Sequence, residues 1–520
     1  MSKLRVAVLA ASIDQLRNWE LKLLNDILMD NQLDLCAVVL TGPFTAPAAP
    51  LFSRLLYNLD KRVFARQPAY PAKHVLSRLR TRPLVNLRNG DDLSSLNLDV
   101  VVRLAAEPLS NELLKSVRFG EWTFNFTETQ SPTFDWTGFW EVKEKAALTI
   151  TAVNIRQASE SVSKTLATAA YNTKFSAALN GAFVEEKSVI LMMRELRRLA
   201  DTRELKPQRH EPLKAKTTLP GMFDATAYMF RLAGNVLGKI MIQARSRLGL
   251  DARSWRVHIG NGSVENFVPG QTTELKLAEG MWAADPFLFR WNNEDYIFFE
   301  CFPNNRQNAW ISVAKLADNK VELLGTCLRT SYHLSYPFIF NDGGDIFMIP
   351  ETHQTNRVEV WRCTQFPLRW ELYATTLEGQ SPADTIMFRT DGQWWLLTSL
   401  SDHYAYMDHC SELYAFAVDG PALRSVVPHK RNPVIIGSDV ARNAGRVHVV
   451  GDRLLRPSQC NSNGTYGYGL NIQEITKIDS NEYAESAVRL VRPDFMSGIV
   501  GCHHIDILGD RFVIDLCKAR

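Results

Sequence analysis

The feature that most constrains the fold is a repeat of short hairpins in the second half of the chain. Five segments each carry an aromatic or aliphatic strand, a tight polar turn and a second apolar strand. Aligned on their first strands, they start 51, 48, 61 and 59 residues apart. A period of about 50 residues is typical of a four-stranded propeller blade, so the sequence predicts an all-β five-bladed propeller over residues 256–520. The five starts are Asp285, Tyr336, Asp384, Gly445 and His504.

The aligned positions also indicate where a functional site would lie. The inner strand of every blade begins near the central axis, so the five starts should converge at one mouth of the channel. Two of them, Asp285 and Asp384, are carboxylates. An aspartate before a hairpin can simply cap a turn, and that interpretation stays open. Two aspartates at the same place in different blades favour a functional cluster.

The first 200 residues have a different pattern, in which continuous apolar strands alternate with helices. Leu4–Ala10 and Leu33–Leu40 flank an amphipathic helical stretch, and further strands are expected at Leu98–Leu104 and Trp122–Phe126. Strands that are apolar throughout belong to parallel sheets covered on both faces. The sequence therefore predicts an α/β Rossmann-like domain, with an open doubly wound sheet, in residues 1–200.

The turn after the first strand excludes one function for this domain. It reads Ala10-Ala11-Ser12-Ile13, without the glycines that let a backbone approach a pyrophosphate. NAD binding is therefore not expected, and the sequence predicts no cofactor.

The run from Asp99 to Asn125 resembles the folate-dependent formyltransferase domain, in which a Gly-x-x-Asn-x-His segment carries the catalytic Asn and His. Asn125 matches the asparagine, but Thr127 stands where the family has histidine, and no counterpart of its later aspartate is found between Thr149 and Lys164. Threonine cannot accept a proton near neutral pH. The resemblance therefore implies a formyltransferase-like domain without formyl transfer, and a strand-end cap is the favoured interpretation of Asn125.

Residues 201–255 are predicted to form a linker and an amphipathic helix. Leu51 to Arg82 and Phe223 to Leu250 both interleave basic with apolar side chains, and Asp60 is the one acidic residue of the first segment. Helices of this kind either cover a neighbouring domain or lie at an anionic membrane surface. Peripheral contact with the inner face of a membrane is thus one of two expectations.

Composition narrows the class of protein. The 59 basic and 56 acidic side chains give a net charge of +3, which is too even for a dedicated nucleic-acid binder. The eight cysteines form no Cys-x-x-Cys pair. We therefore expect a cytoplasmic protein without disulfides or structural zinc.

Motifs in the predicted propeller resemble those of two groups of carbohydrate-active proteins. Trp282-Ala-Ala-Asp285-Pro is similar to the first-blade motif of five-bladed glycoside hydrolases of the arabinanase and fructosidase type. A closer resemblance is to the N-terminal propeller of plant glucosamine inositolphosphorylceramide transferases and to bacterial proteins of polysaccharide loci. It implies carbohydrate chemistry and leaves open whether the plant activity resides in this domain. The motifs are Ala284-Asp-Pro-Phe, Ser335-Tyr-Pro-Phe, Ile349-Pro-Glu-Thr352, Trp394-Trp395, Arg431-Asn-Pro-Val434, Ala441-Arg-Asn-Ala-Gly445, Arg456-Pro-Ser-Gln459 and Tyr466-Gly467.

Glycosyl chemistry assigns expected roles to three carboxylates. Asp285 would be the base or nucleophile, Glu351 the acid, and Asp384 a modulator or second carboxylate. Glu351 could equally be an exposed loop glutamate.

Two arginines are candidates for binding an activated sugar. Arg442 and Arg456 could clamp a phosphate or diphosphate, or could instead pair with Asp439 or Asp452. The other predicted substrate-binding residues are Tyr336, Gln459, Tyr466, His503, His504 and Asp506.

The two adjacent histidines leave a catalytic metal open, although both cannot easily bind the same ion, and no metal site is predicted. Neighbouring residues of a strand point to opposite faces, so His503 and His504 are expected to orient a sugar hydroxyl or to hold a water.

The sequence therefore predicts a glycosyltransferase, or a related glycan-modifying enzyme, of surface polysaccharide or glycolipid biosynthesis. Its partners would be a nucleotide sugar or other activated sugar and a glycan or glycolipid acceptor. A glycoside hydrolase using the same carboxylates and a non-catalytic glycan-binding scaffold are the alternatives.

Overall fold

A computed structural model describes residues 2–42, 48–87, 92–126, 136–158, 160, 163–206, 219–247, 253–278, 280–303, 308–317, 320–401 and 405–519. The chain divides into two compact units. The first consists of Met1–Gly238 with His403–Tyr406, and the second of Lys239–Asp402 with Met407–Arg520. Thr127 and most of the predicted linker, residues 207–218, lie outside the described residues.

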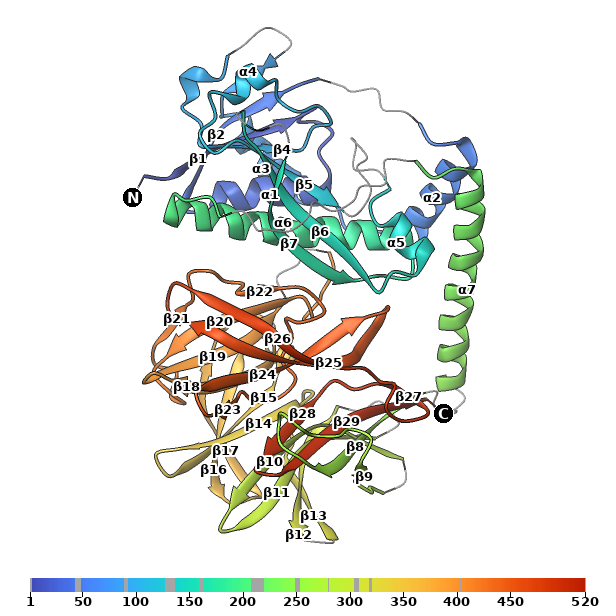
Figure 1. Ribbon diagram of the computed structural model, residues 1–520, viewed down its shortest axis with the longest axis vertical. Coiled ribbons are helices and arrows are strands. Elements are labelled where there is room, and N and C mark those ends of the chain that lie inside the picture. Colours follow the sequence, from blue (N-terminus) through green and yellow to red (C-terminus); the bar gives the residue numbers. More distant parts are fainter. Residues whose placement is uncertain are drawn as a thin grey trace. The chain divides into compact units, whose positions relative to one another are not determined.

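The first unit is built on one mixed sheet (Figure 1). Its strands are β1 (Leu4–Ala10), β2 (Leu33–Leu40), β3 (Leu84–Asn86), β4 (Val100–Arg103), β5 (Glu121–Phe126), β6 (Leu148–Arg156) and β7 (Lys164–Asn172). They follow the order β3-β2-β1-β4-β5-β6-β7. The first five strands are parallel, whereas β6 and β7 add antiparallel pairs at one edge. The order reverses between β1 and β4, as in doubly wound sheets.

The described helices are α1 (Asn18–Met29), α2 (Leu51–Phe64), α3 (Ala72–Leu79), α4 (Asn111–Leu114), α5 (Phe139–Glu144), α6 (Ala177–Thr202) and α7 (Met222–Arg247). In Figure 1, α1 and α6 lie side by side along the sheet. The α6 helix begins at Ser176, whose hydroxyl accepts a hydrogen bond from the backbone N–H of Leu179, a common N-terminal cap. None of the described helices combines the length and apolar character needed to cross a bilayer.

The mixed sheet with its helices confirms the predicted α/β class, although β3, β6 and β7 were not predicted. The formyltransferase label is not confirmed by the fold. Asn125 lies on β5 with its side chain buried, and its Oδ1 accepts no hydrogen bond from the described residues.

The second unit is a five-bladed propeller, which confirms the prediction from the repeats. Blade one holds β10 (Met281–Trp291), β11 (Glu294–Pro303), β12 (Trp310–Ala317) and β13 (Lys320–Leu328). Blade two holds β14 (Ser335–Asp342), β15 (Asp345–Glu351), β16 (Val358–Gln365) and β17 (Arg369–Thr376). Blade three holds β18 (Pro382–Thr390), β19 (Gln393–Leu400), β20 (Glu412–Val418) and β21 (Val426–Pro428), with β22 (Ile435–Ile436) paired to β20. Blade four holds β23 (His448–Val450), β24 (Arg453–Ser462), β25 (Thr465–Ile478) and β26 (Tyr483–Val491).

The fifth blade combines strands from opposite ends of the propeller sequence. It contains β27 (Ile499–Gly501), β28 (Ile505–Leu508), β29 (Arg511–Ala519), β8 (Arg253–Asn261) and β9 (Thr272–Glu274). The green β8 and the red β29 lie side by side in Figure 1 and pair antiparallel from Arg511 opposite Asn261 to Ala519 opposite Arg253. This pairing closes the ring, because a propeller leaves no open sheet edge between its first and last blades.

A bulge interrupts the inner strand of the first three blades at the same place. The register shifts between Ala284 and Phe287 in β10, and at the equivalent positions of β14 and β18. Asp285, Tyr336 and Asp384 occupy these bulges with φ of 50°, 48° and 48°. This left-handed backbone is unusual for residues other than glycine and is found where the chain re-aims a side chain. The bulges therefore explain why the aligned positions share a direction.

Candidate active site at the propeller axis

Four of the five aligned residues contact one another directly. Asp285 accepts a hydrogen bond from the backbone N–H of Tyr336 (3.3 Å), and the hydroxyl of Tyr336 binds the backbone N–H (2.8 Å) and carbonyl (3.2 Å) of Gly445. The His504 ring packs edge-on against Tyr336, with Nδ1 3.7 Å from Oδ1 of Asp285. The repeats thus identified residues that meet at the centre of the propeller.

Asp384 joins the cluster through an arginine. Nε and Nη2 of Arg442 donate to both carboxylate oxygens of Asp384 at 2.5 and 3.0 Å, and Nη2 also donates to Glu351 at 2.9 Å. Both carboxylates are buried. Glu351 is therefore not the exposed loop residue of the alternative interpretation.

The environments of the three carboxylates separate their pKa values. Burial, with the negative charges of Glu300 and Asp384 added, raises the pKa of Asp285 well above its usual range. Burial raises the pKa of Asp384 to about 7, with Glu351 adding to the rise and Arg442 opposing it. Burial would also raise the pKa of Glu351, but Arg442 and the hydrogen bond from His353 outweigh it and hold this pKa well below the usual range.

These directions are the reverse of the roles expected from the sequence. An acid needs a carboxyl group that holds its proton near neutral pH, and Asp285 meets this condition better than Glu351. Glu351 stays ionised and suits the role of base, nucleophile or electrostatic stabiliser.

Asp285 also faces a histidine that is held by a second aspartate. Asp515, on β29, lies 2.6 Å from Nδ1 of His503 and accepts the backbone N–H groups of His503 and His504. Nε2 of His503 lies 3.7 Å from Oδ1 of Asp285, and its ring stacks on Trp255 at 4.0 Å. His503 therefore lies between the carboxyl groups of Asp515 and Asp285, close to the first and beyond hydrogen-bond distance of the second.

Asp515 and Glu300 are residues that the sequence reasoning missed. Glu300, Glu351 and Ser399 lie on the second strand of their blades, opposite the residue before each bulge. A polar residue at the end of an apolar strand was the available signal, for example Glu300 in Ile-Phe-Phe-Glu and Asp515 in Val-Ile-Asp.

Two histidines extend the cluster toward solvent. His333 lies 3.2 Å from Glu300, and His353 lies 2.9 Å from Glu351. Their side chains are 30% and 31% exposed, whereas the two glutamates are 10% and 8% exposed. Burial alone would lower the pKa of His333, but Glu300 raises it. These imidazoles form a polar rim above buried carboxylates.

Two other predicted ligand-binding residues also lie at this site. Gln459 donates from Nε2 to Asp384 at 2.9 Å. The ring of Tyr466 lies 5.3 Å from the Arg442 guanidinium and is 45% exposed. Tyr466 therefore covers Arg442 on its solvent side.

Arg456 does not fit the predicted role of a phosphate clamp. Its Nε and Nη2 donate to the carboxylate of Glu485, and its remaining donors bind Asn443 and the carbonyls of Val440 and Ala441. The side chain is 0% exposed. Its donors are all engaged within the protein, and its acidic partner is neither Asp439 nor Asp452.

Asp506 also has a structural environment. It forms an ion pair with Arg446 and accepts the backbone N–H of Leu288. Arg446 additionally binds the carbonyl of Leu288. This pair ties blade five to blade one.

The described residues also offer one cluster of metal-ligand type. Ligand atoms of Asp285, His503 and Asp515 lie within 4.8 Å of one another. Two carboxylates and an imidazole are suitable ligands for a divalent cation.

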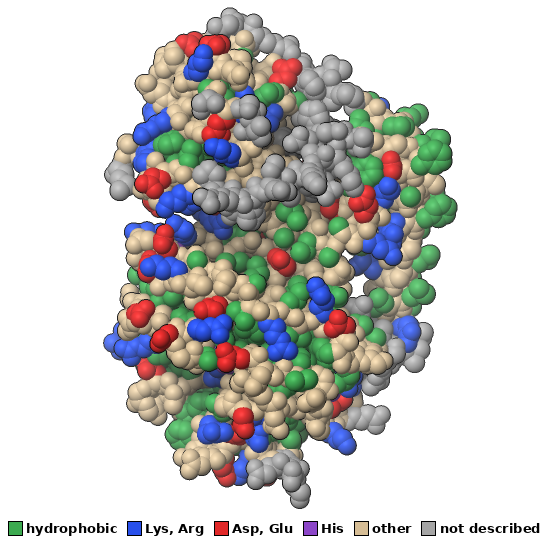
Figure 2. Space-filling view, viewed as in Figure 1, with side chains coloured by type: hydrophobic (Ala, Val, Ile, Leu, Met, Phe, Trp, Pro, Cys, Tyr) green, Lys and Arg blue, Asp and Glu red, His purple; other side chains and the backbone are tan. Residues whose placement is uncertain are grey.

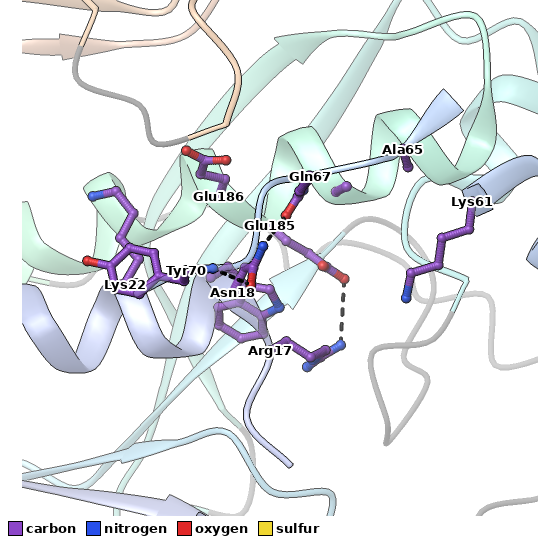
Figure 3. A pocket seen from close by; sticks show the side chains of 11 residues that line it. Arg17, Asn18, Lys22, Lys61, Ala65, Gln67, Tyr70, Glu185 and Glu186 are labelled. Atoms are coloured by element: carbon purple, nitrogen blue, oxygen red, sulfur yellow. Dashed lines mark hydrogen bonds and ion pairs between the residues drawn. The ribbon is translucent and has the colours of Figure 1, made fainter. Parts of the chain in front are cut away.

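A separate cavity of about 320 Å³ lies in the first unit (Figure 3). Arg17 and Glu185 point toward one another across it at 3.7 Å, and Asn18 bonds Gln67. Burial, with Glu20 adding to the rise, brings the pKa of Glu185 to about 7 despite Arg17. Charged and polar side chains thus line a pocket that the sequence did not predict.

Comparison with known proteins agrees with the motifs of the propeller. Residues 271–500 match the family model described as glucosamine inositolphosphorylceramide transferase 1, N-terminal. The relative of that name from Oryza sativa subsp. japonica is 32% identical over 234 residues, which are 43% of this chain and 31% of the relative. The one from Arabidopsis thaliana is 32% identical over 210 residues, 39% of this chain and 27% of the relative. The match thus spans less than a third of these relatives.

Solved structures with a slight likeness are glycoside hydrolases. A family 117 enzyme from Zobellia galactanivorans is 10% identical, with a TM-score of 0.33, over 51% of this chain and 91% of that one. An α-L-arabinanase variant from Cellvibrio cellulosa is 14% identical, with a TM-score of 0.34, over 45% and 85%. Scores this low carry no functional argument. The sequence matches alone show that the propeller of this chain is similar to the N-terminal region of glucosamine inositolphosphorylceramide transferases.

Proposed function

We propose that this chain transfers a sugar residue to a glycan or glycolipid acceptor and that the central cluster of the propeller is its active site. The observation that carries the proposal is the pair of buried carboxylates in adjacent blades, Asp285 and Glu351, whose pKa values are moved in opposite directions. Glycosyl chemistry needs one carboxyl group that donates a proton and another that stays ionised.

In the proposed reaction, Asp285 protonates the oxygen of the leaving group as the glycosidic bond breaks. Glu351, held ionised by Arg442, stabilises the positive charge that develops on the sugar ring. A hydroxyl of the acceptor attacks the anomeric carbon. His503, oriented by Asp515, takes the proton that this hydroxyl loses and passes it to Asp285, which restores the starting state.

The names of the relatives support transfer, since both are called glucosamine inositolphosphorylceramide transferase 1. An activated sugar as donor and a glycolipid as acceptor follow as proposals for this chain. Arg442 and Arg456 are engaged in ion pairs with carboxylates of the protein. We therefore propose the imidazoles of His333 and His353, at the rim, as contacts for the donor phosphate.

The test is an incubation of the full chain with a panel of nucleotide sugars and glycolipid or oligosaccharide acceptors, followed by mass spectrometry. Asp285→Asn should lower turnover by about 100-fold or more, because the proton donor is lost. The matched control is Glu294→Gln, an exposed carboxylate of the same blade, which should keep wild-type turnover.

Full turnover by a folded Asp285→Asn protein would contradict the proposed role. Release of free sugar without an acceptor would instead show a hydrolase that uses water as the nucleophile. Calorimetric binding of a sugar without any product would show a glycan-binding scaffold.

A further inference from the structure

We propose that helices α2 and α7 form a surface that binds an anionic lipid bilayer. The proposal rests on the exposed side chains of the first unit and does not depend on the activity of the propeller. We call this surface the α2–α7 face. Its apolar part consists of Leu55, Leu59 and Val63 on α2 and Phe223, Phe230 and Leu237 on α7.

The exposed apolar residues of each helix lie along one stripe. On α2 they are four residues apart, and on α7 they are seven apart, so in each helix they share a face. Phe223 and Phe230 are 89% and 70% exposed, and Leu55 and Leu59 are each 59% exposed. Figure 2 shows hydrophobic side chains gathered along the flank where Figure 1 places α7. Contiguous large apolar side chains in water usually mark a binding surface.

Buried contacts hold the two helices together. The hydroxyl of Tyr228, on α7, donates to Asp60 on α2, and both residues are buried. The hydroxyl of Ser53 donates to the carbonyl of Gly221, just before α7 begins, at 3.2 Å. The two helices that carry the stripes are therefore fixed against each other.

The charges of the two helices favour an anionic partner. The acidic residues of both helices are engaged inside the unit, because Asp60 is buried and Asp224 pairs with Lys143 at 2.7 Å. The exposed ionised side chains that remain are basic. In the first unit they are Arg54, Lys61 and Arg62 on α2.

This combination selects a lipid surface over a second copy of the chain. Two α2–α7 faces in contact would bring like charges together, which disfavours a dimer through this surface. Anionic headgroups would neutralise the basic side chains while the aromatic and aliphatic groups enter the acyl boundary. The helices would then lie in the plane of the membrane.

The test is co-sedimentation of the full chain with vesicles of phosphatidylcholine alone or of phosphatidylcholine mixed with phosphatidylserine. We expect binding to the mixed vesicles only, weakened by added salt. The double variant Leu55→Gln/Phe230→Gln should bind at least ~10-fold less, because two large apolar groups no longer enter the bilayer. The matched control is Leu372→Gln/Val449→Gln, which changes exposed apolar residues of the propeller and should bind as the wild type does.

Three outcomes would overturn the proposal. They are no binding to anionic vesicles, equal binding to neutral vesicles, and unchanged binding of the α2–α7 double variant. Light scattering that shows a dimer dispersed by this variant would assign the face to self-association instead. Activity on a soluble acceptor should be the same in the double variant and the wild type. A failure of the membrane-binding proposal can therefore be told apart from a failure of the proposed function.

Discussion

Glu351 and Asp384 share the guanidinium of Arg442 at the centre of the propeller, where all three side chains are buried or nearly so. The single positive charge of Arg442 cannot compensate two buried negative charges. One of the two carboxylates must therefore hold a proton, or a cation must bind beside them. The proton is expected on Asp384, whose pKa is raised to about 7 by burial and by Glu351. A single substitution here should therefore change how stability depends on pH.

Asp384→Asn tests this charge balance. Between about pH 4 and pH 7, the folded wild type retains a proton that the unfolded chain releases, so its free energy of unfolding falls as the pH rises. The variant cannot titrate at this position. Its melting temperature relative to the wild type should therefore rise between about pH 5 and pH 8, as measured by thermal unfolding across this range.

Glu371→Gln, which removes an exposed carboxylate, is the control for this experiment and should follow the wild type at each pH. A difference between Asp384→Asn and the wild type that stays flat or falls with rising pH would show that Asp384 is ionised throughout.

The sequence predicted which residues lie at the site better than it predicted which of them are ionised. Alignment of the repeats found Asp285 and Asp384, and the motifs found Glu351 and Arg442. The protonation of each carboxylate depends on neighbours from other blades, such as Glu300 beside Asp285, and no spacing along the chain reveals these. The role of Arg456 was misjudged for the same reason, since Glu485 lies 29 residues away on another strand.

At the scale of single elements, the bulges of the inner strands build the site. Gly445 stands at the equivalent place in blade four with φ of 148°. A Cβ added there would lie 2.0 Å from the carbonyl oxygen of Ile505, so the backbone of blade five passes directly against it. Only glycine fits this contact.

Gly445→Ala should therefore destabilise the propeller by about 2 kcal/mol or more, since neither the backbone conformation nor the space accepts a side chain. Denaturant unfolding measures the loss. Gly451→Ala is the matched control in the same blade, with φ of 59° and no atom within 4 Å of the added Cβ. It should cost only about 1 kcal/mol, the ordinary penalty of a left-handed residue. Equal losses in the two variants would argue against the close contact.

The hairpins of the five blades could be predicted because each one carries its own alternation and turn signals. The starts of the inner strands were predicted close to where the structure has them. For example, Tyr336 was the predicted start of the hairpin that forms β14 and β15. The antiparallel edge of the first unit was missed, since β6 and β7 carry no marked turn between them. Sheet order is set by contacts between distant segments, which a single sequence does not display.

At the scale of the whole molecule, the chain consists of two units with separate cores. The propeller depends on its closing blade, in which nine residues of β29 pair with β8. The same strand carries Asp515, which orients His503. The strand that closes the ring therefore also completes the candidate site.

A chain that ends at Asp510 tests this dependence. Without β29 the edge of β8 is left unpaired, and the propeller should lose its resistance to proteolysis and the proposed sugar transfer. Limited trypsin digestion followed by mass spectrometry will show cleavage throughout residues 253–510. A chain that ends at Ala519 keeps all the pairs and should resist digestion as the full chain does. A protease-resistant propeller in the shorter chain would show that four blades suffice.

The closing blade also determines when the propeller can finish folding during synthesis. During synthesis β8 is made long before β29. Its edge therefore stays unpaired until nearly all residues of the propeller have been made. Within the propeller, His503 and Asp515 are among the last residues to be made. Chains cut short before β29 therefore carry Asp285 and Glu351 but lack Asp515, the residue that binds His503.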